Sequence, residues 1–113
     1  MRPEREQLFD EFNTSIRDAE AKFRGGRWSC SAEVPLDDAA SLSWCKDNGA
    51  WGLYVSASDV LIPLMDASIL LRIAAAEKLE DLWAALLIAQ EKQEKDIKHA
   101  TKLFKSFSPK KES

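Results

Sequence analysis

The chain has 113 residues, which is room for one domain that can fold without disulfides or a structural metal. Hydrophobic residues make up 45% and charged residues 31%, a balance typical of globular domains that excludes a disordered chain. The net charge of -3 argues against a nucleic-acid interface spread over the whole chain. One His, two Cys and four Gly exclude a histidine-rich metal site, a disulfide scaffold and most glycine-rich phosphate loops.

The sequence predicts neither a membrane span nor a secretory signal. It has no run of about 18 apolar residues, and its first seven residues are mixed in charge rather than apolar. We therefore expect a cytoplasmic protein without membrane contact, in which Cys30 and Cys45 are reduced thiols.

The first predicted element is a helix over about 3–24. Pro3 suits the first helical position, Glu4 complements the positive helix start, and Gly25 with Gly26 ends the helix. We expect its apolar stripe to dock on a sheet, with a dimerising coiled coil as the alternative. The stripe consists of Leu8, Phe12, Ile16, Ala19 and Phe23.

A strand is predicted over about 27–34, because apolar and polar residues alternate there and Pro35 follows. A tight hairpin is predicted next, with Asn48 and Gly49 as its two-residue turn between strands over about 41–47 and 50–56. This turn pairs Trp44 with Leu53, Leu42 with Val55 and Lys46 with Trp51. It places Leu42, Trp44, Trp51, Leu53 and Val55 on a core face, and Ser43, Cys45, Gly52 and Tyr54 on a face expected to be wet.

The second half of the chain is predicted to be helical. A short edge strand over about 60–64 contains Pro63, and helices follow over about 67–78 and 79–106. The predicted fold is therefore α+β, with an N-terminal helix, a three- to four-stranded antiparallel sheet and one or two C-terminal helices on one face. Residues 1–107 form the single domain, and 108–113 form a frayed basic tail.

Residues with catalytic or metal-binding potential are few and scattered. His99 is the only imidazole, and it lies far along the chain from both cysteines. The predicted strands place Cys30 and Cys45 on opposite faces, which disfavours a disulfide, and two Cys with one remote His are too few for a zinc site. The Asp residues gather at turns and caps, where they bond their own backbone. We therefore predict no enzymatic activity, no cofactor and no metal.

The four tryptophans raise the question of an aromatic platform for single-stranded bases. Such a platform needs flanking positive charge, whereas Trp44 and Trp51 share a predicted face with aliphatic residues. Trp83 lies on the helical seam that would cover that face. We therefore predict that these tryptophans belong to the core.

The last helix carries the candidate binding site. A helix over 79–107 is roughly 40 Å long, which is longer than a domain of this size is wide, so part of it should overhang. Its seam is polar at Gln90 and Gln93, and large apolar residues resume beyond them. Such residues must be covered by the chain itself, by a second copy or by another protein. The predicted partner-binding residues are Ile97, Leu103, Phe104 and Phe107.

Charge is divided unevenly along the chain. Residues 1–66 carry 7 basic and 12 acidic side chains, and residues 67–113 carry 9 basic and 7 acidic ones. At the basic end, Ser108-Pro109-Lys110-Lys111 resembles the Ser-Pro-Lys-Lys elements of histone tails, over four residues only. The candidate nucleic-acid contacts are Lys98, Lys102, Lys105, Lys110 and Lys111.

These observations favour a non-enzymatic protein-interaction module that self-associates, as a homodimer, or docks another protein through its last helix. The alternatives are a nucleic-acid accessory protein that uses the lysine-rich end, and a small inhibitor encoded by a phage or mobile element. Nucleic-acid binding that falls steeply with salt would support the first alternative. The most informative single experiment is a pull-down from the native host, followed by mass measurement of the intact complex.

Overall fold

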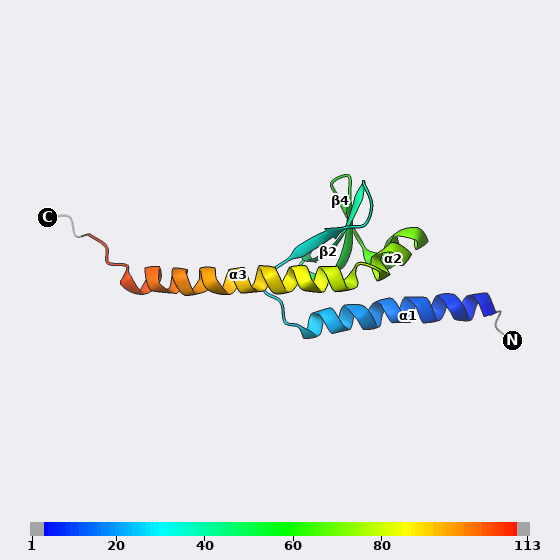
Figure 1. The fold of residues 1–113 in the computed structure, drawn as a ribbon, viewed down its shortest axis with the longest axis horizontal. Helices are drawn as coiled ribbons and strands as arrows, with labels where there is room; N and C mark the ends of the chain where they lie inside the picture. The colour runs from blue at the N-terminus through cyan, green and yellow to red at the C-terminus, as the bar shows by residue number, and fades with distance from the viewer. Residues whose placement is uncertain (1–3, 111–113) are drawn as a thin grey trace.

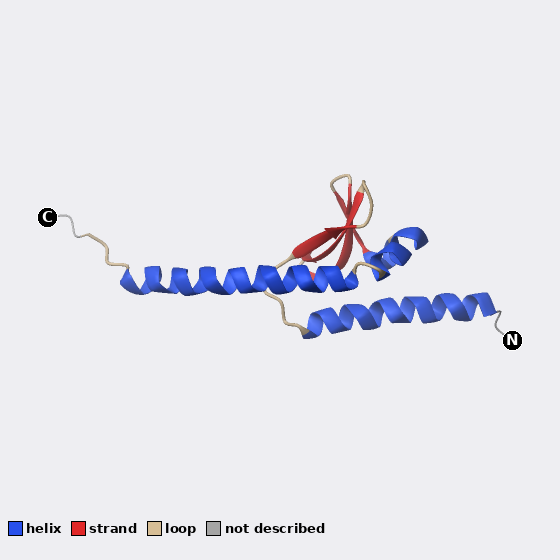
Figure 2. Ribbon diagram, viewed as in Figure 1, coloured by secondary structure: helices blue, strands red, loops and turns tan. Residues whose placement is uncertain are grey.

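The computed structural model describes residues 4–110, and it has the predicted α+β architecture (Figures 1 and 2). An N-terminal helix precedes an antiparallel sheet, and two further helices follow the sheet. The elements are α1 (Glu4–Gly25), β1 (Ala32–Pro35), β2 (Ala40–Asp47), β3 (Ala50–Ala57), β4 (Val60–Pro63), a single 3₁₀ turn (Leu64–Asp66), α2 (Ile69–Ala76) and α3 (Leu79–Ser106). Pro3, at which the first helix was expected to begin, and the end of the tail at 111–113 lie outside the described residues.

The four strands lie in the order β1-β2-β3-β4, and every neighbouring pair is antiparallel. Asn48 and Gly49 join β2 to β3 with φ angles of 50° and 84°, in the left-handed region that a two-residue hairpin requires. The register pairs Trp44 with Leu53, Leu42 with Val55 and Lys46 with Trp51, as the turn predicts. A strongly favoured turn thus determines which side chains of the hairpin reach the core.

The core lies between one face of the sheet and the helices α1 and α3. Leu42, Trp44, Leu53 and Val55 from the hairpin are buried. Leu82 and Leu86 cover them from α3, and Phe23 covers them from α1. Aromatic rings form a continuous cluster: Phe23 stacks on Trp44 with centroids 5.8 Å apart, Trp44 stacks on Trp51 at 6.4 Å, and Trp83 meets Phe23 edge-on at 5.3 Å. Of the tryptophans expected in the core, Trp44 is buried there, and Trp51 and Trp83 pack against it partly buried.

The strand predicted over 27–34 is wrong in its first half. Only Ala32–Pro35 pair with β2. Arg27 has a φ of 52°, and the backbone N–H of Ser29 donates to Gln90 Oε1 of α3 at 3.2 Å rather than to a strand. Trp28 and Cys30 still pack against the core. The alternation of apolar and polar residues therefore predicted correctly which side chains face the core, but it wrongly predicted that the segment pairs as a strand.

The other boundaries differ by small amounts. β4 ends at Pro63, and Leu64 begins the 3₁₀ turn instead of closing the strand. The helix expected over 67–78 is shorter, because Ser68 caps it by accepting from the Leu71 N–H at 3.3 Å and it ends at Ala76. The long helix has the predicted bounds.

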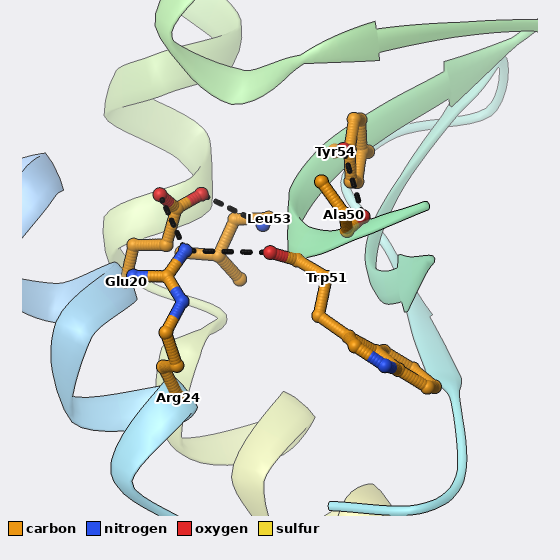
Figure 3. Close-up of polar contacts among 6 residues, drawn as sticks. All are labelled: Glu20, Arg24, Ala50, Trp51, Leu53 and Tyr54. Atoms are coloured by element: carbon orange, nitrogen blue, oxygen red, sulfur yellow. Dashed lines mark hydrogen bonds and ion pairs between the residues drawn. The ribbon is translucent and has the colours of Figure 1, made fainter. Parts of the chain in front are cut away.

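The sheet face opposite the core is not uniformly wet, contrary to expectation. Ser43 and Tyr54 are both buried on it. The Tyr54 hydroxyl donates to the Ala50 carbonyl at 3.2 Å, so the ring lies along its own strand (Figure 3). Gly52 leaves room for this, since a Cβ there would stand 3.3 Å from the Tyr54 ring.

The molecule is elongated, with extents of 83 × 29 × 24 Å. Its radius of gyration is 19.3 Å, against about 13 Å for a compact chain of this length. Figure 1 shows the reason: α1 and α3 lie side by side only where the end of α1 meets the start of α3, and they project from opposite ends of the body. No helix within residues 4–110 is long and apolar enough to cross a membrane.

Candidate protein-interaction surface

The last contact between α3 and the body is polar. Gln90 Oε1 accepts from the Ser29 N–H, Gln93 Nε2 donates to the Ser29 carbonyl at 3.1 Å, and the Ser29 hydroxyl donates to Gln93 Oε1. These bonds account for the polar interruption of the apolar seam. Residues 94–107 beyond them form a projecting segment, the α3 arm, and Figure 2 shows no helix or strand beside it.

The four predicted partner-binding residues all lie on the α3 arm. Phe104 is 82% exposed and Phe107 75% exposed, and Ile97 and Leu103 are more than half exposed. The side chains of Leu103, Phe104 and Phe107, with Ala100, enclose a shallow apolar hollow. Ile97, Ala100, Phe104 and Phe107 continue, at helical spacing, the same face that Leu82 and Leu86 bury against the sheet. The structure therefore gathers Ile97, Ala100, Phe104 and Phe107, with Leu103 beside them, into one uncovered surface that we call the apolar row. That this row binds a partner stays a prediction.

The predicted lysines lie on a different side of the arm. Lys98, Lys102 and Lys105 are four and three residues apart, which puts them together on the face roughly opposite the apolar row. All three are exposed, and within residues 4–110 none of them forms an ion pair. Lys110 follows the helix, and Lys111 lies outside the described residues. A nucleic-acid contact of these lysines remains a prediction.

A second uncovered apolar surface lies at the other end of the molecule, and the sequence reasoning missed it. The stripe of α1 was expected to dock on the sheet along its length, but only its C-terminal half does so. Leu8 is 65% exposed, and Phe9 is exposed as well. At roughly 33 Å, α1 is too long for the body it leaves. The same comparison of helix length with domain width that predicts the α3 overhang would have predicted this one.

Between α1 and α2 this surface deepens into an apolar cavity of about 200 Å³, which we call the α1/α2 groove. Its walls come from α1, α2, the start of α3, β3 and the 3₁₀ turn. The lining residues are Phe12, Ser15, Ile16, Ala19, Leu53, Leu64, Arg72, Ala75, Ala76 and Leu79.

Arg72 holds the two walls of the groove together. Its Nη1 donates to Asn13 Oδ1 on α1 at 2.7 Å, and its Nε donates to the Ala67 carbonyl at 3.1 Å. The guanidinium also lies over the Phe12 ring, 5.8 Å from its centroid. One hydrogen bond and one cation–π contact therefore join α2 to α1 across the groove.

Glu20 and Arg24 fix α1 against the sheet (Figure 3). Glu20 Oε2 accepts from the Leu53 N–H at 2.9 Å, and Arg24 Nη2 donates to the Trp51 carbonyl at 3.3 Å. The two side chains also pair with each other at 3.3 Å. This clamp joins the C-terminal part of α1 to β3 at Leu53, which also lines the groove.

The residues considered for catalysis are not brought together. His99 is on the exposed arm, Cys30 packs near the Leu86 carbonyl, and Cys45 lies on the sheet face opposite the core. Burial raises the pKa of the Cys45 thiol, and the charges of Asp47 and Glu33 raise this pKa further. Burial also raises the pKa of Cys30. Higher pKa values leave less of the nucleophilic thiolate at neutral pH.

Metal-ligating side chains are equally dispersed. Within the described part of the chain, no three His, Cys, Asp or Glu residues stand close enough to hold one ion. Comparison with known proteins adds no assignment: no protein-family model matches this chain, and no curated protein and no solved structure matches it.

Proposed function

We propose that this chain is a protein-interaction module, not an enzyme, and that it binds another protein chain through the α3 arm. The observation that carries the proposal is the apolar row on the arm, which no described part of the chain covers. Fully burying one side chain of this size is favourable by about 1.5–3 kcal/mol, so a partner that covers the row gains several such contributions.

The arm suits recognition of a helix by a groove. In that mode an amphipathic helix lays apolar anchors, spaced by three and four residues, into a hydrophobic cleft. Ile97, Ala100, Phe104 and Phe107 are three, four and three residues apart. The helix also continues through the arm to Ser106, so the anchors are already displayed in helical register before binding.

Site-specific photo-crosslinking tests the proposal. A benzophenone amino acid replaces Phe104 in one variant and, as a matched control on the opposite side of the same helix, Lys102 in another. In the cells that make the protein, we expect position 104 to give covalent protein adducts that position 102 does not. Adding Phe107→Ser should weaken the adducts at position 104. Equal labelling from positions 102 and 104, or none from either, would contradict the proposal.

A further inference from the structure

We infer that the partner of the α3 arm is a second copy of this chain, and that the arm's apolar row docks in the α1/α2 groove of that copy. The inference rests on the proposed function, because it names the occupant of the same binding surface. Four independent features support it: the position, length, charge and shape of the two surfaces.

The arm and the groove cannot meet within one chain. The arm is the C-terminal part of α3, whereas the groove is lined by Leu79 at the N-terminal start of the same helix, and α1 and α3 project to opposite ends of a molecule 83 Å long (Figure 1). Within residues 4–110, both the arm and the groove are therefore left uncovered by the chain itself. A second copy supplies the missing member of each pair, which no single chain can do for itself.

The lengths of the two surfaces match. The arm, residues 94–107, is about 21 Å long, and the part of α1 from its start to the groove, residues 4–15, is about 18 Å long. An arm laid along α1 would place its terminal aromatic residues beside the groove while its earlier turns cover Leu8 and Phe9.

Charge favours contact of the arm with α1 over contact of one arm with another. The arm, residues 94–107, carries four lysines and two acidic residues, so its net charge of +2 disfavours contact between two arms. Residues 4–13 of α1 carry four acidic residues and one arginine. The opposite net charges of the two helix segments attract, and the apolar stripes supply the contact between them.

The groove has room for an aromatic side chain. A cavity of about 150 Å³ lined by apolar side chains accommodates benzene, and the α1/α2 groove measures about 200 Å³ with apolar walls. Phe104, at 82%, is the most exposed large apolar side chain in the described part of the chain, and Phe107 is 75% exposed, as is Leu70 on α2. One phenyl ring from the partner's arm fits the groove, and it would cover Phe12 and Ile16 from solvent.

A complementation experiment tests this contact. The arm variant carries Phe104→Ser and Phe107→Ser. The groove variant carries Ser15→Lys and Ala76→Lys, which place long cationic side chains at two exposed positions of the groove lining and so repel a lysine-rich arm. A third variant, Glu4→Lys with Glu11→Lys, removes the charge attraction at exposed positions and replaces the groove variant if that one does not fold.

Sedimentation equilibrium is measured from about 1 µM to about 1 mM. We expect the wild-type chain to exceed the 12.7 kDa of one chain, and each variant alone to remain at that mass. An equimolar mixture of the arm and groove variants should form a complex of twice this mass, because the intact arm of one meets the intact groove of the other.

Two results would overturn the inference. One is a groove variant that associates as the wild type does, since this would mean that arms pair with arms. The other is a wild-type chain or a mixture that stays monomeric. If the pure chain is monomeric but position 104 still crosslinks to a different protein in cells, the inference fails and the proposed function stands. If neither association nor crosslinking is found, both fail.

Discussion

At the scale of single residues, Glu20 and Arg24 bond to backbone groups of β3 that the short strand β4 does not reach. β4 pairs with β3 only from Tyr54 onward, so the N–H of Leu53 and the carbonyl of Trp51 lie beyond its end. Glu20 accepts from the first of these groups and Arg24 donates to the second. Gly52 lies between them, and a Cβ there would approach Glu20 Oε2 to 3.1 Å. Two side chains of a helix thus extend the hydrogen bonding of the sheet.

We predict that Glu20→Ala lowers the free energy of unfolding by about 1–2 kcal/mol, because a charged acceptor is removed from a half-buried backbone N–H. Glu20→Gln should lose less, since its amide oxygen still accepts. Urea unfolding followed by tryptophan fluorescence measures both. Glu11→Ala, an exposed change on the same helix, serves as control and should stay within about 0.5 kcal/mol of wild type. Equal loss in the Glu20 and Glu11 variants would refute the clamp.

The sequence could predict residues whose role is local and could not predict those that act over a distance. Asn48 and Gly49 predict their turn and its register because positive φ angles are a property of the residues themselves. Glu20 gives no such signal. Its partner, Leu53, is 33 residues away, and the contact exists only because Phe23 anchors the end of α1 in the core.

At the scale of elements, α3 consists of two parts with different surroundings. Its first half is buried against β1 and β2, and its second half is exposed. Gln90 and Gln93 mark the boundary, since both bind Ser29. The spacing of its apolar residues predicts the whole helix, because the same period continues through both parts. It could not predict that these two glutamines bind the segment before β1, which lies more than 60 residues away.

We predict that Gln93→Ala lowers the free energy of unfolding by about 1 kcal/mol, because the Ser29 carbonyl loses its donor. Lys92→Ala is the matched control: it makes a similar change in helix propensity one residue earlier, at an exposed position. Chemical denaturation of the two variants gives the comparison. The account of this boundary is wrong if Gln93→Ala is no less stable than Lys92→Ala.

The strand wrongly predicted over 27–31 also reflects a contact with α3, which lies far away in the sequence. Alternating apolar and polar residues report which side chains face the core, and Trp28 and Cys30 do face it. The pattern contains no information on whether the backbone has a neighbouring strand. Here it has α3 as its neighbour, so the segment is buried on one side without joining the sheet.

At the scale of the whole molecule, two helix segments project from the body in opposite directions. A chain that buries its core between the sheet and the inner halves of α1 and α3 leaves the outer halves uncovered at opposite ends. The comparison of helix length with domain width predicted the α3 arm. The same comparison applied to α1 predicts that the N-terminal half of α1 also projects beyond the body. The α1/α2 groove could not be predicted, because its walls come from five elements whose relative positions depend on the packed core.

The most direct test of the docking of the arm in the groove is amide hydrogen exchange of the wild-type chain as a function of its concentration. The arm and the exposed part of α1 are covered by the same contact, so we predict that exchange slows in residues 97–107 and in residues 8–16 over the same concentration range. Exchange in both segments that does not change with concentration, or slowing in the arm alone, would contradict this account.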